Sequence, residues 1–104
     1  MLKVISRESP VTADEGTAFL VAPHRMMTAA HVVDDTRGIT VKAGDDTLPV
    51  TVVYCDPLHD VAVLDVPGVT CDVLSFADAA RGQAAVSIGY PNDRPLTLRP
   101  ARVL

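Results

Sequence analysis

The chain has 104 residues, 48% of them hydrophobic, and a formal net charge of −4. This length suits one domain, and the apolar content is enough for a hydrophobic core. The acidic charge, with aspartates paired at Asp34–Asp35 and Asp45–Asp46, argues against a nucleic-acid partner. No apolar run approaches the roughly 20 residues of a membrane span, and no secretory signal is visible, so we expect no membrane association and a cytoplasmic location as written.

Short strands separated by turns are predicted for most of the chain, with little support for a helix longer than a turn or two. A weak first strand covers residues 2–6 and ends at Ser9–Pro10. The next strands are expected at residues 17–21, 26–28, 39–43, 48–55 and 61–66. About six short strands at this spacing suit a closed antiparallel barrel.

The strand pattern weakens between residues 70 and 83, which we interpret as a connector. Within it, residues 75–82 are predicted to form a single helical turn that ends at Gly82. Strand-like runs resume at residues 84–88 and 96–104, on either side of a turn.

His31 stands out because an ionisable residue occurs in an apolar pattern that predicts burial. It follows the strand at residues 26–28, on a tight turn of small residues formed by Ala29 and Ala30. A ring that is held rigidly there while it still reaches a cleft has what general-base catalysis requires. Taken alone, the position favours a hydrogen-bonded core histidine.

Three segments, in order, are similar to segments of trypsin-like serine proteases. GTAFLV at residues 16–21 with TAAHV at residues 28–32 resembles the surroundings of the catalytic histidine. DPLHDVAVL at residues 56–64 resembles the aspartate segment, and residues 82–91 resemble a strand of the bacterial Deg-like, or high-temperature-requirement, branch. Each motif alone would be weak, but together they cover nearly the whole chain.

This resemblance implies an all-β chain and peptide-bond hydrolysis by a serine endopeptidase. It implies a six-stranded antiparallel barrel over residues 1–69, a connector over residues 70–83, and the first two strands of an incomplete second barrel over residues 84–104. His31 would be the general base and acid, and a buried Asp60 would orient it. Ala29 and Ala30 would leave room for the carboxylate, and Gly16 is interpreted as the turn before its strand. The polypeptide substrate belongs to the complete enzyme.

The nucleophile that the resemblance requires is not found. A trypsin-like serine lies in a G-x-S-G-G turn, and none of the four serines, Ser6, Ser9, Ser75 and Ser87, has that setting. Loss of an oxyanion hole alone costs about a hundredfold to a thousandfold in rate, so we expect this chain to be inactive by itself. Two alternatives stay open: a truncated, non-catalytic binding or assembly module, and a chain completed by a second polypeptide or a second copy that supplies the missing C-terminal half.

Other potential sites are weaker. A metal site drawn from His24, His31, His59, Asp60 and Cys55 is conceivable, but no two of these residues have the close spacing of a zinc motif. We therefore expect no metal and no cofactor, with His24 and His59 in exposed turns.

The two cysteines, Cys55 and Cys71, are interpreted as buried thiols, although a bridge between them is possible. The bridge that many secreted animal members of the family place beside the histidine is absent, because Val32 follows His31. Near the end of the chain, Arg94, Arg99 and Arg102 are interpreted as one solvated strand face rather than an anion site.

Overall fold

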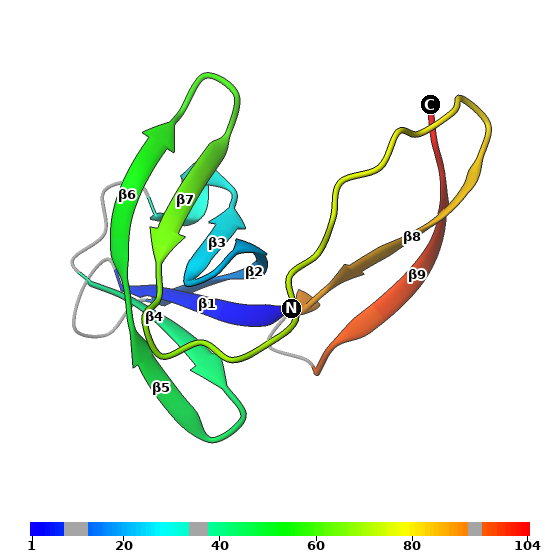
Figure 1. Ribbon diagram of the computed structural model, residues 1–104. Coiled ribbons are helices and arrows are strands. Elements are labelled where there is room, and N and C mark those ends of the chain that lie inside the picture. Colours follow the sequence, from blue (N-terminus) through cyan, green and yellow to red (C-terminus); the bar gives the residue numbers. More distant parts are fainter. Residues whose placement is uncertain (8–12, 34–37, 92–94) are drawn as a thin grey trace.

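The computed structural model describes residues 1–7, 13–33, 38–91 and 95–104 (Figure 1). Three sequence-based expectations lie outside these ranges: the strand end at Ser9–Pro10, the turn at Asp34–Asp35, and the placement of Arg94. Strands dominate the described ranges, and the one helix found there, α1 (Ala30–Val33), is four residues long. No helix in this part of the chain has the length and apolar content needed to cross a bilayer.

The larger sheet has seven antiparallel strands. They are β1 (Leu2–Arg7), β2 (Ala13–Ala22), β3 (Arg25–Thr28), β4 (Gly38–Ala43), β5 (Asp46–Pro49), β6 (Thr51–Asp56) and β7 (Val61–Asp65). Their order across the sheet is β5-β4-β1-β2-β3-β7-β6. The prediction of an all-β chain is therefore confirmed.

The sheet is curled into a half-barrel, and the chain connectivity shows why. β5 and β6 are the two edge strands, yet only Val50 separates them along the chain. With consecutive Cα atoms about 3.8 Å apart, the two edges must meet at this corner, as Figure 1 shows. The single strand expected over residues 48–55 is thus two strands. Pro49 has no N–H group to continue the ladder with β4, and the chain turns at Val50 to pair with β7 instead.

Apolar side chains on the inner face of this curled sheet form the core. In β7, the buried Ala62 and Leu64 alternate with partly exposed neighbours, as the period of two along a strand requires. Thr28 is a buried polar residue, and its hydroxyl donates to the carbonyl of Thr17 at 2.8 Å, which satisfies it. The fully buried side chains with the largest volumes are Met26, Leu64, Val4, Val41 and Val66.

Gly16 lies inside β2, so its interpretation as a turn was wrong. A Cβ atom at this position would lie 2.7 Å and 2.8 Å from the two γ-methyl carbons of Val32 in α1. Real Cβ contacts are not this short, so the missing side chain allows α1 to pack directly on the backbone of β2. The glycine therefore helps to place the helical turn that carries His31.

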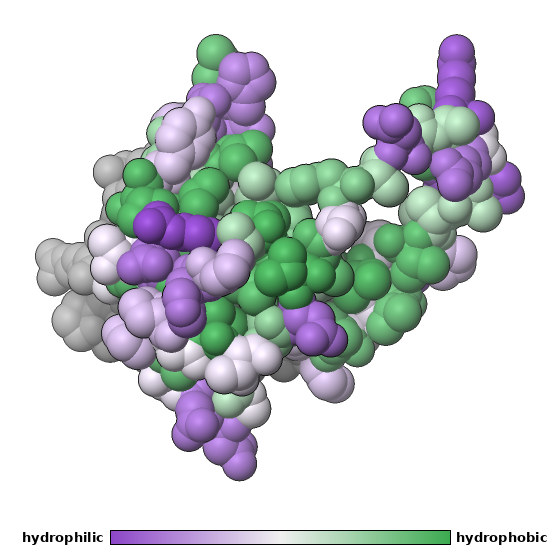
Figure 2. Space-filling model, viewed as in Figure 1, coloured by the Kyte–Doolittle hydropathy of each residue, from purple (hydrophilic) through white to green (hydrophobic). Residues whose placement is uncertain are grey.

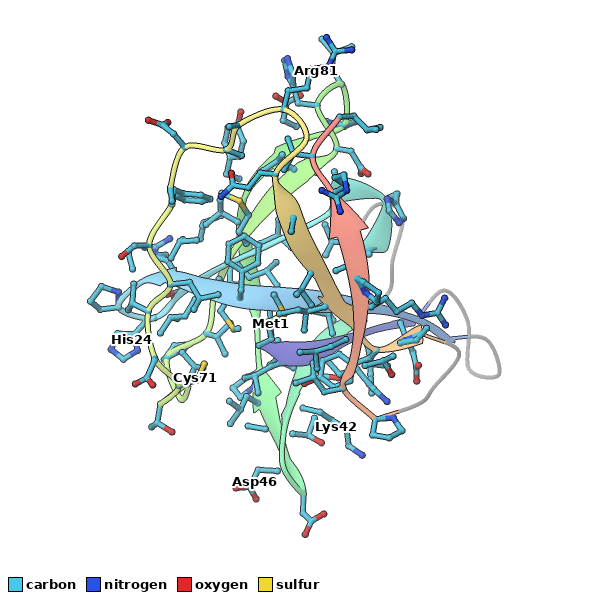
Figure 3. All side chains as sticks on the ribbon, turned by 90° about the vertical axis from the view of Figure 1, so that its right-hand side faces the viewer. Met1, His24, Lys42, Asp46, Cys71 and Arg81 are labelled. Atoms are coloured by element: carbon cyan, nitrogen blue, oxygen red, sulfur yellow. The ribbon has the colours of Figure 1, made fainter. Side chains whose placement is uncertain are left out.

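Residues 70–83 connect the half-barrel to the last two strands without the helical turn expected at residues 75–82. The chain is held extended instead: Leu74 donates its N–H to the carbonyl of Leu20 at 2.8 Å. Phe76 packs edge-to-face on Phe19, with ring centroids 6.2 Å apart. These two contacts along β2 replace the local hydrogen bonds that a helical turn would make. Arg81 lies at the far tip of the connector (Figure 3).

Among the described strands, β8 (Ala84–Gly89) and β9 (Thr97–Arg102) pair only with each other and form a separate two-stranded sheet. Its base is attached to β1, where the Tyr90 hydroxyl donates to the carbonyl of Met1 at 3.0 Å and the Lys3 ammonium lies 5.6 Å from the Tyr90 ring centroid. Arg99 and Arg102 are three residues apart and thus on opposite faces of β9, so the single arginine face was wrong.

The surface of this hairpin is markedly apolar. Figure 2 shows apolar side chains extending from the half-barrel across to the base of the hairpin. The exposed large hydrophobic residues in the connector and the hairpin are Val73, Leu74, Phe76, Val86, Ile88, Leu96 and Leu98. A two-stranded hairpin is marginally stable by itself in water, and this one has little covering its apolar side chains.

Candidate active site

His31 and Asp60 come from segments that the sheet brings together. β3 ends at Thr28, and His31 follows in α1. Asp60 is the last residue of the turn between β6 and β7. Because β3 pairs with β7, with Thr28 opposite Ala62, the residue just before β7 lies beside the start of α1. The ladder thus brings together two residues that are 29 positions apart.

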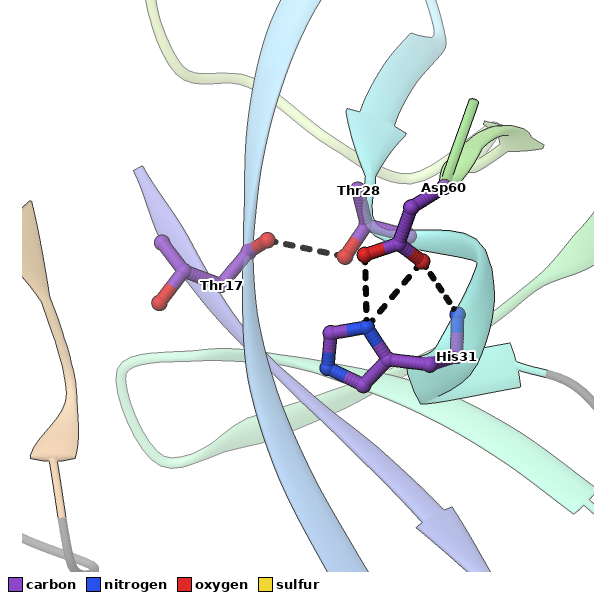
Figure 4. Close-up of polar contacts among 4 residues, drawn as sticks. All are labelled: Thr17, Thr28, His31 and Asp60. Carbon is purple, nitrogen blue, oxygen red and sulfur yellow. Dashed lines mark hydrogen bonds and ion pairs between the residues drawn. The ribbon is translucent and has the colours of Figure 1, made fainter. Parts of the chain in front are cut away.

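The predicted contact between the two side chains is confirmed (Figure 4). Nδ1 of His31 lies 2.8 Å from Oδ2 and 3.0 Å from Oδ1 of Asp60. The backbone N–H of His31 also donates to Oδ1, at 2.8 Å. An ionised carboxylate can only accept hydrogen bonds, so Nδ1 must carry the proton. In a neutral ring, Nε2 is then the unprotonated nitrogen with a free lone pair.

The carboxylate is held in its charged form. The backbone N–H of His31 first, and the His31 ring second, lower the pKa of Asp60 from its usual value of 3.8. The same N–H belongs to the first turn of α1, where backbone donors have no partner within the helix. One carboxylate therefore satisfies the start of α1 and fixes the orientation of the ring.

Both side chains are more exposed than expected: 74% for His31 and 50% for Asp60. The expectation of a buried imidazole and a buried aspartate was wrong. Ala30, Val32 and Val33 of α1 face the core, and His31 is the residue of this turn that points outward. Water screens an ion pair at such exposure, so the contact matters for orientation more than for stability. Within the described ranges, Asp60 is the sole hydrogen-bond partner of the ring, which leaves Nε2 open.

The backbone of Asp60 is unusual. Its φ is 55°, in the left-handed region, which aspartate and asparagine tolerate better than most residues. The turn before it is organised by Asp56, whose carboxylate accepts from the N–H groups of Leu58 and His59 at 3.1 Å and 3.3 Å. Asp56 was not among the site residues predicted from the sequence. The available signal was an aspartate before proline at a turn.

The remaining candidates do not gather around this pair. His24 and His59 are exposed, as expected, and His59 contacts Asp56 instead, with Nδ1 at 2.7 Å from Oδ2. Across the described ranges, no three histidine, cysteine or acidic side chains form a metal-binding group. Both cysteines are free: Cys55 is exposed, so its buried interpretation was wrong, and Cys71 is partly buried on the connector (Figure 3).

Comparison with known proteins identifies the family. Residues 16–104 match the model of the trypsin-like peptidase domain, and the chain belongs to this family. It is 45% identical over 91 residues to serine protease Rv3671c of Mycobacterium tuberculosis, covering 86% of this chain and 23% of that protein. It is 37% identical over 92 residues to a probable periplasmic serine endoprotease, DegP-like, of Chlamydia pneumoniae, covering 82% of this chain and 19% of that protein.

Solved structures of serine proteases share the fold of this chain. The crystal structure of the Rv3671c protease in its active form matches with a TM-score of 0.90 and 42% identity, over 97% of this chain and 46% of that one. A serine endoprotease from Yersinia pestis matches at 21% identity with a TM-score of 0.77, over 95% of this chain and 38% of that one, which shows the shared fold. The predicted trypsin-like fold and bacterial type are confirmed. The chain corresponds to the N-terminal portion of the protease domain and spans about a quarter or less of the curated relatives.

Proposed function

We propose that this chain carries the acid–base half of a serine endopeptidase site, with His31 as general base and acid and Asp60 as the carboxylate that orients it. The observation that carries the proposal is the contact of Nδ1 with both Asp60 oxygens, at 2.8 Å and 3.0 Å. This contact leaves Nε2 unprotonated and free to accept a proton. The family membership of the chain supports the same assignment.

In the proposed reaction, a serine outside this sequence loses its hydroxyl proton to Nε2 of His31 while its oxygen bonds to the carbonyl carbon of the peptide. Asp60 stays ionised and stabilises the imidazolium that forms. The imidazolium then gives the proton to the departing amine as the C–N bond breaks. A water molecule then attacks the acyl-enzyme by the same steps: it gives a proton to His31 as its oxygen bonds to the acyl carbon. His31 returns that proton to the serine oxygen as the acyl–serine bond breaks. Polypeptides are thus the proposed substrates of the complete enzyme.

The proposal also divides the chain: residues 1–69 as the first barrel, residues 70–83 as a connector, and residues 84–104 as the first two strands of the second barrel. The separate two-stranded sheet and the irregular connector support this division. The missing C-terminal half would complete the second barrel and supply the nucleophile. It is the partner that the apolar hairpin requires.

The test supplies the rest of the protease domain by fusion. Residues 1–104 are fused to the part of the crystallised Rv3671c protease that they do not cover, and the fusion is treated with a fluorophosphonate probe. We expect covalent labelling on the added part and none on residues 1–104 alone.

His31→Ala should reduce kcat of the fusion by about a millionfold, and Asp60→Asn by about ten-thousandfold. Asp45→Asn, a change at an exposed turn, is the matched control and should leave kcat unchanged. Full labelling of the His31→Ala fusion would refute the assignment.

A second candidate is a binding or assembly module that has no catalysis of its own. The observation that favours it is the absence of a G-x-S-G-G serine from this sequence, together with the exposed side chains of Val86 and Leu98. A properly folded fusion that hydrolyses no peptide and binds no probe would favour this candidate. A labelled fusion would exclude it for the complete protein.

A further inference from the structure

The Asp56 carboxylate contacts three neighbouring residues of its own segment, Tyr54, Leu58 and His59. Asp56 ends β6, and its Oδ1 accepts from the N–H groups of Leu58 and His59 at 3.1 Å and 3.3 Å. Its Oδ2 lies 2.7 Å from Nδ1 of His59 and accepts a long bond from the Tyr54 hydroxyl at 3.4 Å. These partners lie in β6 before the turn, at Tyr54, and within the turn itself, at Leu58 and His59. With its side chain 26% exposed, Asp56 is also more buried than the Asp60 carboxylate.

The turn that Asp56 organises is the segment that presents Asp60. Residues 57–60 connect β6 to β7, and the pairing of Asp56 with Val61 closes the ends of this loop. The two N–H groups that bond to Asp56 point into the turn, so the chain reverses within four residues. Asp60, the last residue of the turn at residues 57–60, has a φ of 55°, and its carboxylate reaches the N–H and Nδ1 of His31.

A left-handed backbone at a residue other than glycine persists only where its surroundings hold it. Asp60 has its own side-chain contacts with His31, but these depend on the direction in which its Cα–Cβ bond leaves the turn. That direction is set by the backbone of residues 57–60. The side chain of His59, foremost among its donors, lowers the pKa of Asp56, so the turn is held by a charged acceptor.

We infer that Asp56 is a positioning residue for the His31–Asp60 pair: it holds the turn in the one conformation from which the Asp60 carboxylate reaches His31. It makes no contact with His31 and takes no part in proton transfer. Its importance for catalysis rests on the proposed function, whereas its effect on the geometry of the pair does not. Asp56 is therefore testable in the chain as it is.

The test follows the backbone amide of His31 by NMR in residues 1–104. This N–H donates to Asp60, so its exchange rate with water reports the contact and not the general stability of the sheet. Asp56→Ala should raise that exchange rate about fivefold or more, the factor expected for loss of a hydrogen bond. Asp56→Asn keeps an oxygen acceptor that suits this turn and should restore most of the protection.

The matched control is Asp45→Ala, which removes an exposed aspartate from the turn between β4 and β5. It should leave the His31 amide unchanged. Amides in the core, such as those of Val41 and Leu64, should exchange as in the parent chain in every variant that is compared. This readout separates a local loss of the Asp60 contact from general unfolding.

If Asp56→Ala does not fold, Asp56→Ser is used in its place, because a serine hydroxyl supports the same kind of turn more weakly. We then expect exchange of the His31 amide between the rates of the parent chain and of Asp60→Ala. Parent-like exchange in Asp56→Ala, or in Asp56→Ser where that variant replaces it, would overturn the inference. So would an Asp56→Asn variant that restores no protection. Neither result would affect the assignment of His31 and Asp60, which depends on labelling of the completed enzyme.

Discussion

At the scale of single residues, the candidate site depends on one carboxylate with two partners. Asp60 accepts from the backbone of His31 and from its ring, so the same group starts α1 and aligns the imidazole. Because both side chains are largely exposed, the stabilisation from this contact is small. The contact matters because it selects the Nδ1-protonated tautomer of the His31 ring.

The first prediction concerns pH. The pKa of Asp60 is lower in the folded chain than its usual value of 3.8, chiefly because of the His31 backbone N–H. The charged carboxylate therefore adds stability above about pH 4. That stability is lost as the pH falls through the lowered folded-state pKa. Urea unfolding of the parent and Asp60→Asn should give free energies of unfolding that differ near neutral pH and converge in acid.

Asparagine suits this test because it tolerates the left-handed backbone of residue 60 and keeps the shape of the side chain while removing its charge and one acceptor oxygen. Asp45→Asn provides the background for losing an exposed turn carboxylate. A difference between parent and Asp60→Asn that stays constant into acid would show that the carboxylate contributes no charge-dependent stability.

The candidate site residues were more predictable than their environment. His31 and Asp60 were found because their neighbours, TAAHV and DPLHDVAVL, combine small residues, turn residues and apolar strands in a familiar order. The exposure of the two side chains was not predicted, because an apolar pattern around His31 does not tell which residue of a helical turn faces outward. The role of Asp56 was missed because its hydrogen bonds depend on a folded turn.

At the scale of elements, α1 is placed by the close approach of Val32 to Gly16. A second prediction follows: Gly16→Ala should lower the free energy of unfolding by about 1–3 kcal/mol, because the new methyl group overlaps the Val32 side chain. It should also move α1, and with it His31. Urea unfolding measures the first effect, and the chemical shift of the His31 amide measures the second.

The matched rescue is Gly16→Ala with Val32→Ala, which removes the two methyl carbons that a new Cβ would meet. The second change should cost less in the Gly16→Ala background than in the parent, since it then also relieves the overlap. Strictly additive effects in this cycle would contradict a direct contact between the two positions.

Strand positions were predicted closely where apolar residues alternate, as in residues 39–43, or form a short apolar run bounded by turns, as in residues 61–65. The break at Val50 was not predicted, because it results from closure of the sheet and not from local sequence alone. The prediction of a helical turn at residues 75–82 was wrong for a similar reason. Local propensity there was overridden by contacts with Leu20 and Phe19 of β2.

At the scale of the whole molecule, the hairpin of β8 and β9 is the part with unsatisfied surface. Val86 is 56% exposed and Leu98 is 61% exposed. Val86, Ile88 and Leu98 share one face, since Ile88 pairs with Leu98 and lies two residues from Val86. Apolar side chains gathered on one exposed face favour association.

The third prediction is that residues 1–104 associate reversibly in a concentration-dependent manner, through this face. Sedimentation equilibrium should give an average mass that rises with concentration above the 11.0 kDa of one chain. Leu98→Lys should return the mass to that of a monomer by placing a charge on the face. Leu58→Lys is the control, because Leu58 is 89% exposed but lies in the turn after β6. A parent chain that stays monomeric at all concentrations would contradict the prediction.

The protonation of the His31 ring tests the acid–base assignment most directly. Long-range proton–nitrogen NMR spectra distinguish a ring protonated at Nδ1 from one protonated at Nε2. Near pH 8, we expect neutral His31 to carry its proton on Nδ1, donated to Asp60, and Asp60→Ala to shift the population towards the Nε2-protonated form. His24 serves as the internal control and should not change. An Nε2-protonated His31 in the parent chain, or a tautomer indifferent to Asp60→Ala, would contradict the assignment of His31 as the general base oriented by Asp60.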